Sequence, residues 1–313
     1  MSLGILLVSF FTFVELNCEN LFDCVHDSLK DDMEFLPDSY RHWNHYKYWQ
    51  KIDHIGQEII ACGEDGDDWS LPDLVALCEV ENDSVMTDLT KRSLLRKAGY
   101  EYVMTNSPNE RGIDVALLYS PLSFAFINSR SVRINPLKDM RPTRDILYVS
   151  GRIITGDTLH VFVVHAPSRF GGEKLTRPYR MLVCEKLSEA IDSVYRITPN
   201  AKILIAGDFN DSYDGKPMKK LYESKVIDVS AEAKGSHGAK GSYRYHGHWE
   251  SIDHILCSSS LKDSFLDCRI ADFPFLLEED DKYGGVHPKR SYYGAKFKNG
   301  FSDHLPLIAK FSL

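Results

Sequence analysis

The apolar residues of this chain gather in short runs, and several runs stop abruptly at acids, amides or histidines. The clearest case is residues 202–211, KILIAGDFND, in which residues 203–206 have the composition of a fully buried strand. Gly207 permits a turn or a close approach of two backbones. Asp208 and Asn210 follow the strand's carboxyl end, where open α/β sheets bind their ligands. Taken alone, the motif fits equally an Asx turn that leaves a strand.

Comparable apolar or alternating runs predict the other strands. They cover residues 11–16, 74–77, 100–105, 115–119, 124–135, 148–154, 159–164, 252–256 and a last segment that ends at residue 311. The pair 148–154 and 159–164 is expected to form a hairpin over Gly156 and Asp157, and 124–135 an antiparallel edge.

Helical spacing of apolar residues predicts a smaller set of helices. They cover residues 51–62, 85–98, 178–194 and 218–224. Pro178 is expected in the first turn of its helix, and the aromatic residues of 42–50 are expected to pack at the start of theirs. Residues 235–249 are expected to form a loop or irregular hairpin, and residues 273–294 a long polar loop.

The succession of these elements indicates a fold class. Strands and helices alternate but hairpins join several strands, which indicates mixed sheets with helices outside them, in one domain of 313 residues. Residues 4–14 are apolar, too few to span a bilayer, and lack a basic start and a cleavage site. Residues 1–10 therefore fit a signal remnant, an engineered start or a buried first strand. The compartment, cytoplasmic or exported, stays open.

Composition excludes some classes of protein. The hydrophobic share of 43% and charged share of 26% are ordinary for a globular protein. A net charge of −8 argues against broad electrostatic capture of nucleic acid, but a nuclease that uses a divalent cation is still compatible with it. The seven cysteines include no CxxC pair and show neither a disulfide framework nor a zinc pattern. Nothing in the sequence marks a protein partner or an oligomer interface.

The polar residues at predicted strand ends form one candidate site. They are Asn17, Glu19, Glu79, His165, Asp208, Asn210, Asp253, Asp303 and His304. Each residue alone has a structural explanation, but together they suit the hydrolysis of a phosphate ester. Mg²⁺ prefers oxygen ligands, takes one or two carboxylates and keeps water for its substrate. Histidines and a further carboxylate can then position water and stabilise a phosphoryl transition state.

The motifs themselves resemble a known family. ELNCEN, LCEVEN, VHAPS, GDFND and the pair SIDHI and SDHLP resemble, in order, the endonuclease/exonuclease/phosphatase superfamily of DNase I-like metal-dependent phosphoesterases. RGIDVALLY and GSYRYHGHWESIDHIL resemble its bacterial members. The resemblance implies a four-layer α/β sandwich, in which two packed mixed β-sheets are flanked by helices and the site lies at one rim.

The resemblance also implies roles for the candidate residues. Glu79 is expected to be the main metal carboxylate, with Asn17 nearby, Asp303 as a direct or water-mediated ligand, and Glu19 helping to hold the metal. Asp208 is expected to orient or deprotonate the attacking water, with Asn210 fixing it or the phosphate.

The histidines have roles of their own. His304, oriented by Asp253, is expected to contact the phosphate or act as general base, and His165 to bind a non-bridging oxygen. Whether Asp208 or His304 takes the proton of water stays open.

Other polar residues carry weaker expectations. Arg111, Ser168 and Arg169 are candidate phosphate contacts, and a surface role is nearly as good an explanation for the two arginines. His254 is expected to point away from Asp253 and to be structural. Asp114 is expected to shape a turn. The segment with Lys138, Arg141 and Arg144 is expected to be a solvated loop.

The sequence thus predicts an Mg²⁺-dependent phosphoesterase, with Mn²⁺ able to substitute. Water is expected to attack a phosphodiester directly, in a nuclease-like reaction on DNA or RNA. The alternative is a phosphatase or phosphodiesterase that acts on inositol phosphates or on phospholipid and sphingomyelin-type substrates. The sequence leaves open the substrate, the endo or exo mode and the number of metal ions.

Overall fold

Two six-stranded sheets form the centre of the computed structural model, which describes residues 10–66 and 68–313. The first sheet has the order β15-β20-β1-β4-β6-β5, with bounds Phe265–Ile270, Leu307–Ser312, Phe10–Leu21, Leu74–Val80, Asp114–Tyr119 and Glu101–Met104. The second has the order β11-β14-β10-β9-β8-β7, with bounds Val226–Asp228, Asp253–Ser258, Lys202–Asp208, Thr158–His165, Ile146–Ile153 and Phe124–Val132. Parallel pairs (β1 with β4, β9 with β10) occur among antiparallel ones, so the expected mixed sheets are confirmed.

Alternation along β1 explains how the layers pack. Phe13 points toward the second sheet and joins a core with Leu204, whereas Val14 points the other way and joins a core with Ile52 of α1 (His45–Ala61). Burying one such side chain contributes about 1.5–3 kcal/mol. A third core packs α3 (Glu173–Ile197) on the outer face of the second sheet.

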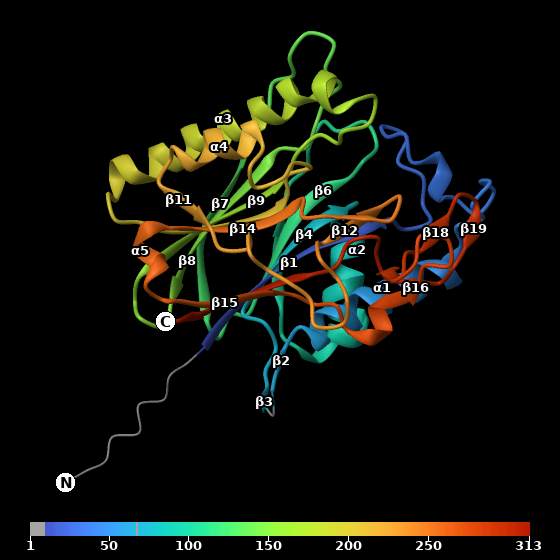
Figure 1. Ribbon diagram of the computed structural model, residues 1–313, viewed down its shortest axis with the longest axis horizontal. Helices are drawn as coiled ribbons and strands as arrows, with labels where there is room; N and C mark the ends of the chain where they lie inside the picture. Colours follow the sequence, from blue (N-terminus) through green and yellow to red (C-terminus); the bar gives the residue numbers. More distant parts are fainter. Residues whose placement is uncertain (1–9, 67) are drawn as a thin grey trace.

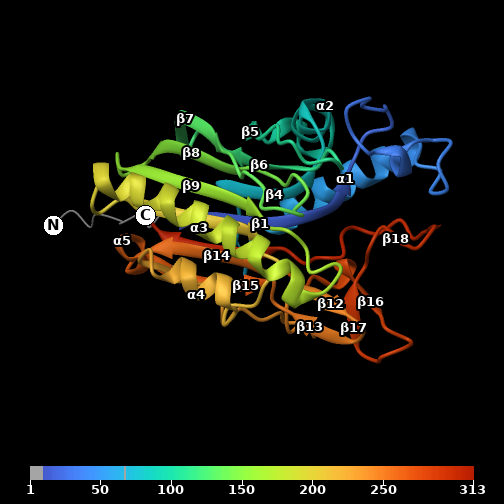
Figure 2. The same ribbon diagram turned by 90° about the horizontal axis from the view of Figure 1, so that it is seen from above.

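The helices therefore lie outside the pair of sheets. Figure 1 shows α3 and α4 (Lys216–Tyr222) on one side of the sheets and α1 with α2 (Asp83–Thr87) on the other. Figure 2 shows the same layers from above. Helix, sheet, sheet and helix follow one another, which is the predicted α/β sandwich.

Three of the predicted helices differ in detail. The helix predicted from residue 51 starts at His45, because Asn44 caps it by accepting a hydrogen bond from the Lys47 amide at 3.1 Å. The predicted helix 85–98 is divided into α2, a π-helical turn (Asp88–Arg92) and a 3₁₀ turn (Leu94–Lys97), with extended backbone at Ser93. Helix α3 starts at Glu173, so Pro178 lies inside it, and the prediction that Pro178 occupies the first turn is wrong.

Short strands account for most of the remaining differences. The hairpin β12 (Tyr243–Tyr245) and β13 (His248–Glu250) overlaps the predicted loop or irregular hairpin and ends one residue beyond it. The long loop predicted at 273–294 is wrong, because it contains a 3₁₀ turn (Pro274–Leu276), β16 (Leu277–Glu279), β17 (Val286–Pro288) and β18 (Tyr292–Tyr293), which pairs with β19 (Lys296–Phe297). Edge strand β15 was not predicted. The other short elements are a 3₁₀ turn (Met33–Phe35), β2 (Glu64–Asp65), β3 (Asp68–Trp69) and α5 (Ser259–Lys262).

All seven cysteines are free thiols, in agreement with the absence of a disulfide pattern in the sequence. None of the helices in the described part of the chain has the length and apolar character needed to cross a membrane. The expectation for residues 1–10 lies outside the described residues, except that Phe10 begins β1.

Candidate active site

Strand register brings the predicted site residues to one edge of the sandwich. The parallel strands β9 and β10 end at His165 and Asp208, which are register partners. Strand β14 runs antiparallel to β10 and begins at Asp253, opposite Asp208. From the first sheet, Asn17 of β1 reaches across the interface, and its Nδ2 donates a hydrogen bond to Asp208 Oδ2 at 3.2 Å.

Irregular backbone at this edge aims the carboxylates. The pairing of β1 with β4 shifts after Asn17, and that of β4 with β6 shifts around Glu79, as expected of bulges that redirect side chains. Glu19, Glu79 and Asn210 all have left-handed backbone, with φ of 47°, 62° and 51°. Because non-glycine residues adopt this conformation at a cost of about 1–3 kcal/mol, the surrounding fold must hold them there.

Gly207 has a specific steric reason to be glycine. Its φ is 145°, and a Cβ atom at this position would lie 1.8 Å from the carbonyl oxygen of Val164 on β9. The close backbone approach that the sequence allowed is therefore present, and it sets Asp208 beside His165.

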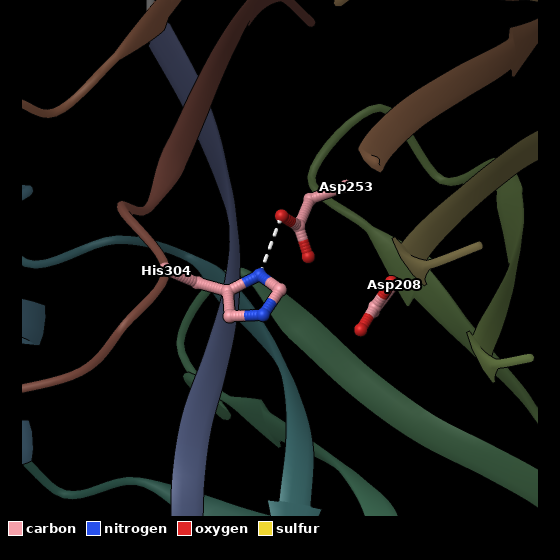
Figure 3. Close-up of side chains that lie close together, drawn as sticks. All are labelled: Asp208, Asp253 and His304. Carbon is pink, nitrogen blue, oxygen red and sulfur yellow. Dashed lines mark hydrogen bonds and ion pairs between the residues drawn. The ribbon is translucent and has the colours of Figure 1, made fainter. Parts of the chain in front are cut away.

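His304 and Asp253 form a hydrogen-bonded pair (Figure 3). The His304 Nδ1–H donates to Asp253 Oδ2 at 2.7 Å, which leaves Nε2 free to face the site. Burial alone would lower the pKa of His304, but Asp253, Asp303 and Asp208 raise it well above its ordinary value. The ring is thus held in one orientation and favoured in its cationic form.

Asp208 lies at the centre of the site. Its Oδ1 accepts a hydrogen bond from the Asn210 amide at 2.8 Å, and its Oδ2 lies 3.5 Å from His165 Nε2. Burial and the nearby Asp253 raise the pKa of Asp208 to about 7. The Asn210 side chain points elsewhere and donates to the Ala166 carbonyl at 3.2 Å.

His165 is buried and favoured in its neutral form. Burial lowers its pKa well below the ordinary value, and the cationic Arg144 adds to this effect. Its Nδ1 has no hydrogen-bond partner among the described residues, and its Nε2 lies 3.9 Å from Glu79 Oε1. A neutral imidazole in this place can donate a hydrogen bond to an incoming oxygen.

Carboxylate and amide oxygens at this edge fit a divalent cation. Glu79 Oε2 accepts a hydrogen bond from the Asn20 amide at 2.8 Å, which leaves Oε1 facing the site. Asp208, Asp253 and His304 offer ligand atoms within 4.8 Å of one another. The hydrogen bond between Asp253 and His304 already uses two of their atoms, and both oxygens of Asp208 also accept hydrogen bonds. Glu79 Oε1 is therefore the better oxygen donor for Mg²⁺, with Asn17 Oδ1 beside it, which accepts one hydrogen bond from the Glu19 amide at 3.0 Å.

Two of the predicted metal residues are engaged by an arginine. Glu19 Oε2 accepts a hydrogen bond from the Ser291 amide at 2.7 Å, and its Oε1 lies 3.3 Å from Arg290 Nε. Arg290 Nη2 also donates to Asp303 Oδ2 at 2.8 Å. Asp303 keeps its Oδ1 on the side of His304, 4.0 Å from Nε2, whereas both oxygens of Glu19 are occupied. Glu19 can therefore help to hold the metal through Arg290, and its predicted role at the metal stays a prediction.

The weaker phosphate candidates are dispersed. Arg111 donates a hydrogen bond to the Asn20 side chain beside Glu79, so its guanidinium is close to the site. Arg169 is paired with Glu250 of β13, and Ser168 is exposed on the loop after β9. Of the three, the structure brings only Arg111 next to the carboxylates.

Arg144 is a site residue that sequence reasoning missed. The predicted solvated loop is wrong at this position, because Arg144 points inward and donates to the Ala166 carbonyl at 2.8 Å. Burial lowers the pKa of its guanidinium, and Glu79 and Asp208 act on it in the opposite direction. An irregular loop shows no hydrophobic periodicity, so the sequence gives no direct signal for Arg144. The one indication is its position immediately before Asp145 and Ile146, which are buried in the structure.

Two flanking residues have the structural roles expected of them. His254 Nδ1 is 2.8 Å from Asp228 Oδ2, and its Nε2 is 2.9 Å from the Asp211 carbonyl oxygen, away from the site. Asp114 is buried at the start of β6, where it accepts a hydrogen bond from the Ser107 amide at 3.1 Å and shapes the preceding turn.

Comparison with known families decides the family of the chain. Residues 12–312 match the model of the Endonuclease/Exonuclease/phosphatase family. The chain belongs to this family. Its members are hydrolytic phosphoesterases that in general depend on a divalent metal, so the protein is a phosphoric ester hydrolase. A search of curated protein sequences gave no significant match.

Solved structures of other proteins share the fold. A Bacteroides thetaiotaomicron family protein has a TM-score of 0.62 at 16% identity, with 96% of this chain and 94% of that chain covered. The mannosyl-6-phosphatase of B. thetaiotaomicron has a TM-score of 0.63 at 15% identity, with 96% and 98% covered. TDP2 from C. elegans has a TM-score of 0.60 at 14% identity, with 97% and 75% covered. These identities show the fold alone, and they confirm the DNase I-like sandwich.

Proposed function

We propose that this phosphoesterase hydrolyses a phosphodiester with bound Mg²⁺, by direct attack of water on phosphorus. The observation that supports this most is the meeting of Asn17, Asp208, His165 and the His304–Asp253 pair at one edge of the sandwich. Hydrogen bonds fix the orientation of Asn17, Asp208 and the His304–Asp253 pair, as pre-organised catalysis requires, and His165 is buried with its Nε2 3.5 Å from Asp208.

Residues of the first sheet, and of the loop that precedes its strand β20, are proposed to hold the metal. Glu79 supplies the main carboxylate and Asn17 an amide oxygen, with Asp303 as a further ligand, directly or through water, and Glu19 in support through Arg290. A bound Mg²⁺ would polarise the phosphate and favour ionisation of a nearby water. Mn²⁺ is expected to substitute, because it takes the same oxygen ligands.

The remaining residues are proposed to bind the phosphate and to move the proton. Asp208 is fixed by donors on both oxygens and takes the proton of the attacking water. His304, made cationic by Asp253, contacts a phosphate oxygen through Nε2. Neutral His165 donates to a second non-bridging oxygen, and Asn210 holds Asp208 in place.

The substrate is proposed to be a nucleic-acid phosphodiester. A phosphatase acting on a monoester is the second candidate, supported by the similar fold of the mannosyl-6-phosphatase and by the net charge of −8. Inositol polyphosphates are less favoured, because Arg169 and Arg290 are already paired with carboxylates. Lipid and sphingomyelin-type diesters stay as the remaining alternative.

A panel of substrates tests the proposal. Bis-p-nitrophenyl phosphate, p-nitrophenyl phosphate, plasmid DNA, inositol polyphosphates and sphingomyelin are incubated with Mg²⁺, Mn²⁺ or EDTA. We expect metal-dependent cleavage of the diester and DNA, abolished by alanine at Glu79, Asp208 or His304 while the variants stay folded. Activity confined to p-nitrophenyl phosphate, a monoester, would refute the phosphodiesterase and support the phosphatase alternative. Activity that survives all three substitutions would refute the site.

A further inference from the structure

A cleft of about 280 Å³ lies directly beside the candidate active site. Its floor includes Glu19 and Asn20 at the end of β1, where Asn20 also holds Glu79 through its backbone amide. Its walls come from two loops, one with Tyr40 and Arg41 before α1 and one with Tyr292 and Tyr293 of β18. Figure 1 shows these two segments side by side at the same end of the molecule.

Contacts between the two loops hold the walls of the cleft in place. The Tyr292 hydroxyl donates a hydrogen bond to the Arg41 carbonyl at 3.1 Å, and the Arg41 guanidinium lies 5.1 Å from the centre of the Tyr292 ring. Tyr40 and Tyr293 are 59% and 43% exposed. The Arg41 guanidinium lies 5.6 Å from the centre of the Tyr40 ring, and the Arg290 guanidinium and Lys298 ammonium each lie 5.6 Å from that of Tyr293. The cleft is therefore preformed and presents aromatic and guanidinium surfaces.

Charge pairing shows what kind of group fits. Among the described residues that line the cleft, Arg41 is paired with Glu34 at 2.8 Å, and Arg290 with both Glu19 and Asp303. Each guanidinium charge is thus already balanced, which disfavours a second phosphate group. Polar groups beside the rings disfavour an acyl chain. An uncharged planar ring with hydrogen-bonding edges matches this surface, since it can stack on tyrosine and arginine.

We propose that this cleft binds the nucleobase of a nucleotide whose phosphate lies at the active site. The inference rests on the proposed phosphodiesterase function and adds the place at which one base of the nucleic-acid substrate is bound. The volume, near the lower end of the roughly 300–1,000 Å³ of small-molecule sites, suits one base and not a duplex. Tyr40 and Tyr293 are the residues expected to stack on it.

Binding without turnover tests this directly. Calorimetry with Mg²⁺ and the Asp208→Asn protein compares thymidine 5′-phosphate with 2-deoxyribose 5-phosphate, which lacks the base. We expect the nucleotide to bind at least about tenfold more tightly. Tyr40→Ala and Tyr293→Ala should remove most of this preference, whereas Tyr40→Phe and Tyr293→Phe, which keep the ring, should retain it. Tyr46→Ala, which removes an exposed ring outside the cleft lining, serves as the matched control.

The outcomes separate this inference from the proposed function. Equal affinity for the two ligands, no measurable binding of the nucleotide, or a base preference that survives loss of both rings would overturn the cleft assignment. A base preference that depends on the rings, in a protein that cleaves only monoesters, would support the cleft and refute the phosphodiesterase. Tighter binding of an inositol polyphosphate than of thymidine 5′-phosphate would also count against a nucleobase site.

Discussion

Asn17 and Asp208 belong to different sheets and are 191 positions apart, yet the Asn17 side chain donates a hydrogen bond to the Asp208 carboxylate. The contact crosses the interface between the two sheets at the edge where both carry their polar residues. The geometry of the site therefore depends on how the sheets pack. A substitution in the core between them can alter activity without touching the site.

Asp253→Asn should affect catalysis more than folding. The amide oxygen can still accept the Nδ1–H of His304, but the negative charge that favours the cationic ring is lost. We expect kcat to fall by about 10²–10⁴-fold with a small change in KM. Steady-state kinetics over a range of pH measure this.

The matched control is Asp228→Asn. Asp228 and His254 form a similar buried pair at 2.8 Å that points away from the site. This variant should lose stability while the active fraction keeps its kcat. Equal kinetic losses in both variants would argue that Asp253 is merely structural.

The same Asp228–His254 pair predicts a pH dependence of stability. Burial opposes charge on His254, but Asp228 raises the pKa of its ring. The contribution of His254 to the free energy of unfolding is therefore full below about pH 6.5 and is lost as pH rises through the pKa of the folded state. Burial likewise opposes charge on Asp228, but His254 lowers its pKa, so its contribution is full above about pH 3.9 and is lost as pH falls further.

The pair is therefore most stabilising between about pH 4 and 6.5. Thermal unfolding of the wild type and Asp228→Asn should differ most in this window, by about 3–5 kcal/mol in unfolding free energy. A difference that grows as pH rises above 7 would contradict the assignment of charge to His254.

Substitutions of the metal carboxylates should separate direct from indirect ligands. Glu79→Gln is expected to weaken Mg²⁺ activation by more than about 100-fold, because Glu79 faces the site directly. Glu19→Gln is expected to weaken it by about tenfold, since Glu19 acts through Arg290. Titration of Mg²⁺ into EDTA-treated protein gives both values. The reverse order would restore Glu19 as a direct ligand.

Gly207→Ala should destabilise the fold strongly. The added methyl group would meet the Val164 carbonyl, and the residue would be held at a φ of 145°. We expect a loss of more than about 3 kcal/mol, measured by urea unfolding. Gly156→Ala, with a φ of 87° and open space around it, is the control and should cost only about 1 kcal/mol. Similar losses in the two variants would show that the contact with β9 is unimportant.

Sequence reasoning succeeded where local pattern and chemistry coincide. Buried runs that stop at Asp208, His165 and Glu79 predicted both the central strands and the edge where these side chains meet. The fold class and the family followed from the same motifs and are confirmed. The His304–Asp253 contact was expected as well, although the catalytic roles of these residues stay predictions.

The sequence was less informative where tertiary contacts decide the structure. Strands of two or three residues, such as β16 and β18, carry too few positions for an alternating pattern. Arg144 and Arg290 come from irregular loops, and their partners are distant in sequence. For Glu19, the surrounding motif resembles that of a metal ligand, but the sequence does not reveal that Arg290 and Ser291, far away along the chain, donate hydrogen bonds to its carboxylate oxygens.

Arg290 lines the cleft and at the same time bridges Glu19 and Asp303. A ligand that draws this guanidinium toward itself must weaken its hold on Asp303, and a cation bound by Asp303 must compete with the same arginine. If both sites bind as proposed, occupancy of one must change the affinity of the other by an equal factor in both directions. Under this proposal, ligand binding in the cleft and metal binding by Asp303 are linked through the ion pairs of Arg290.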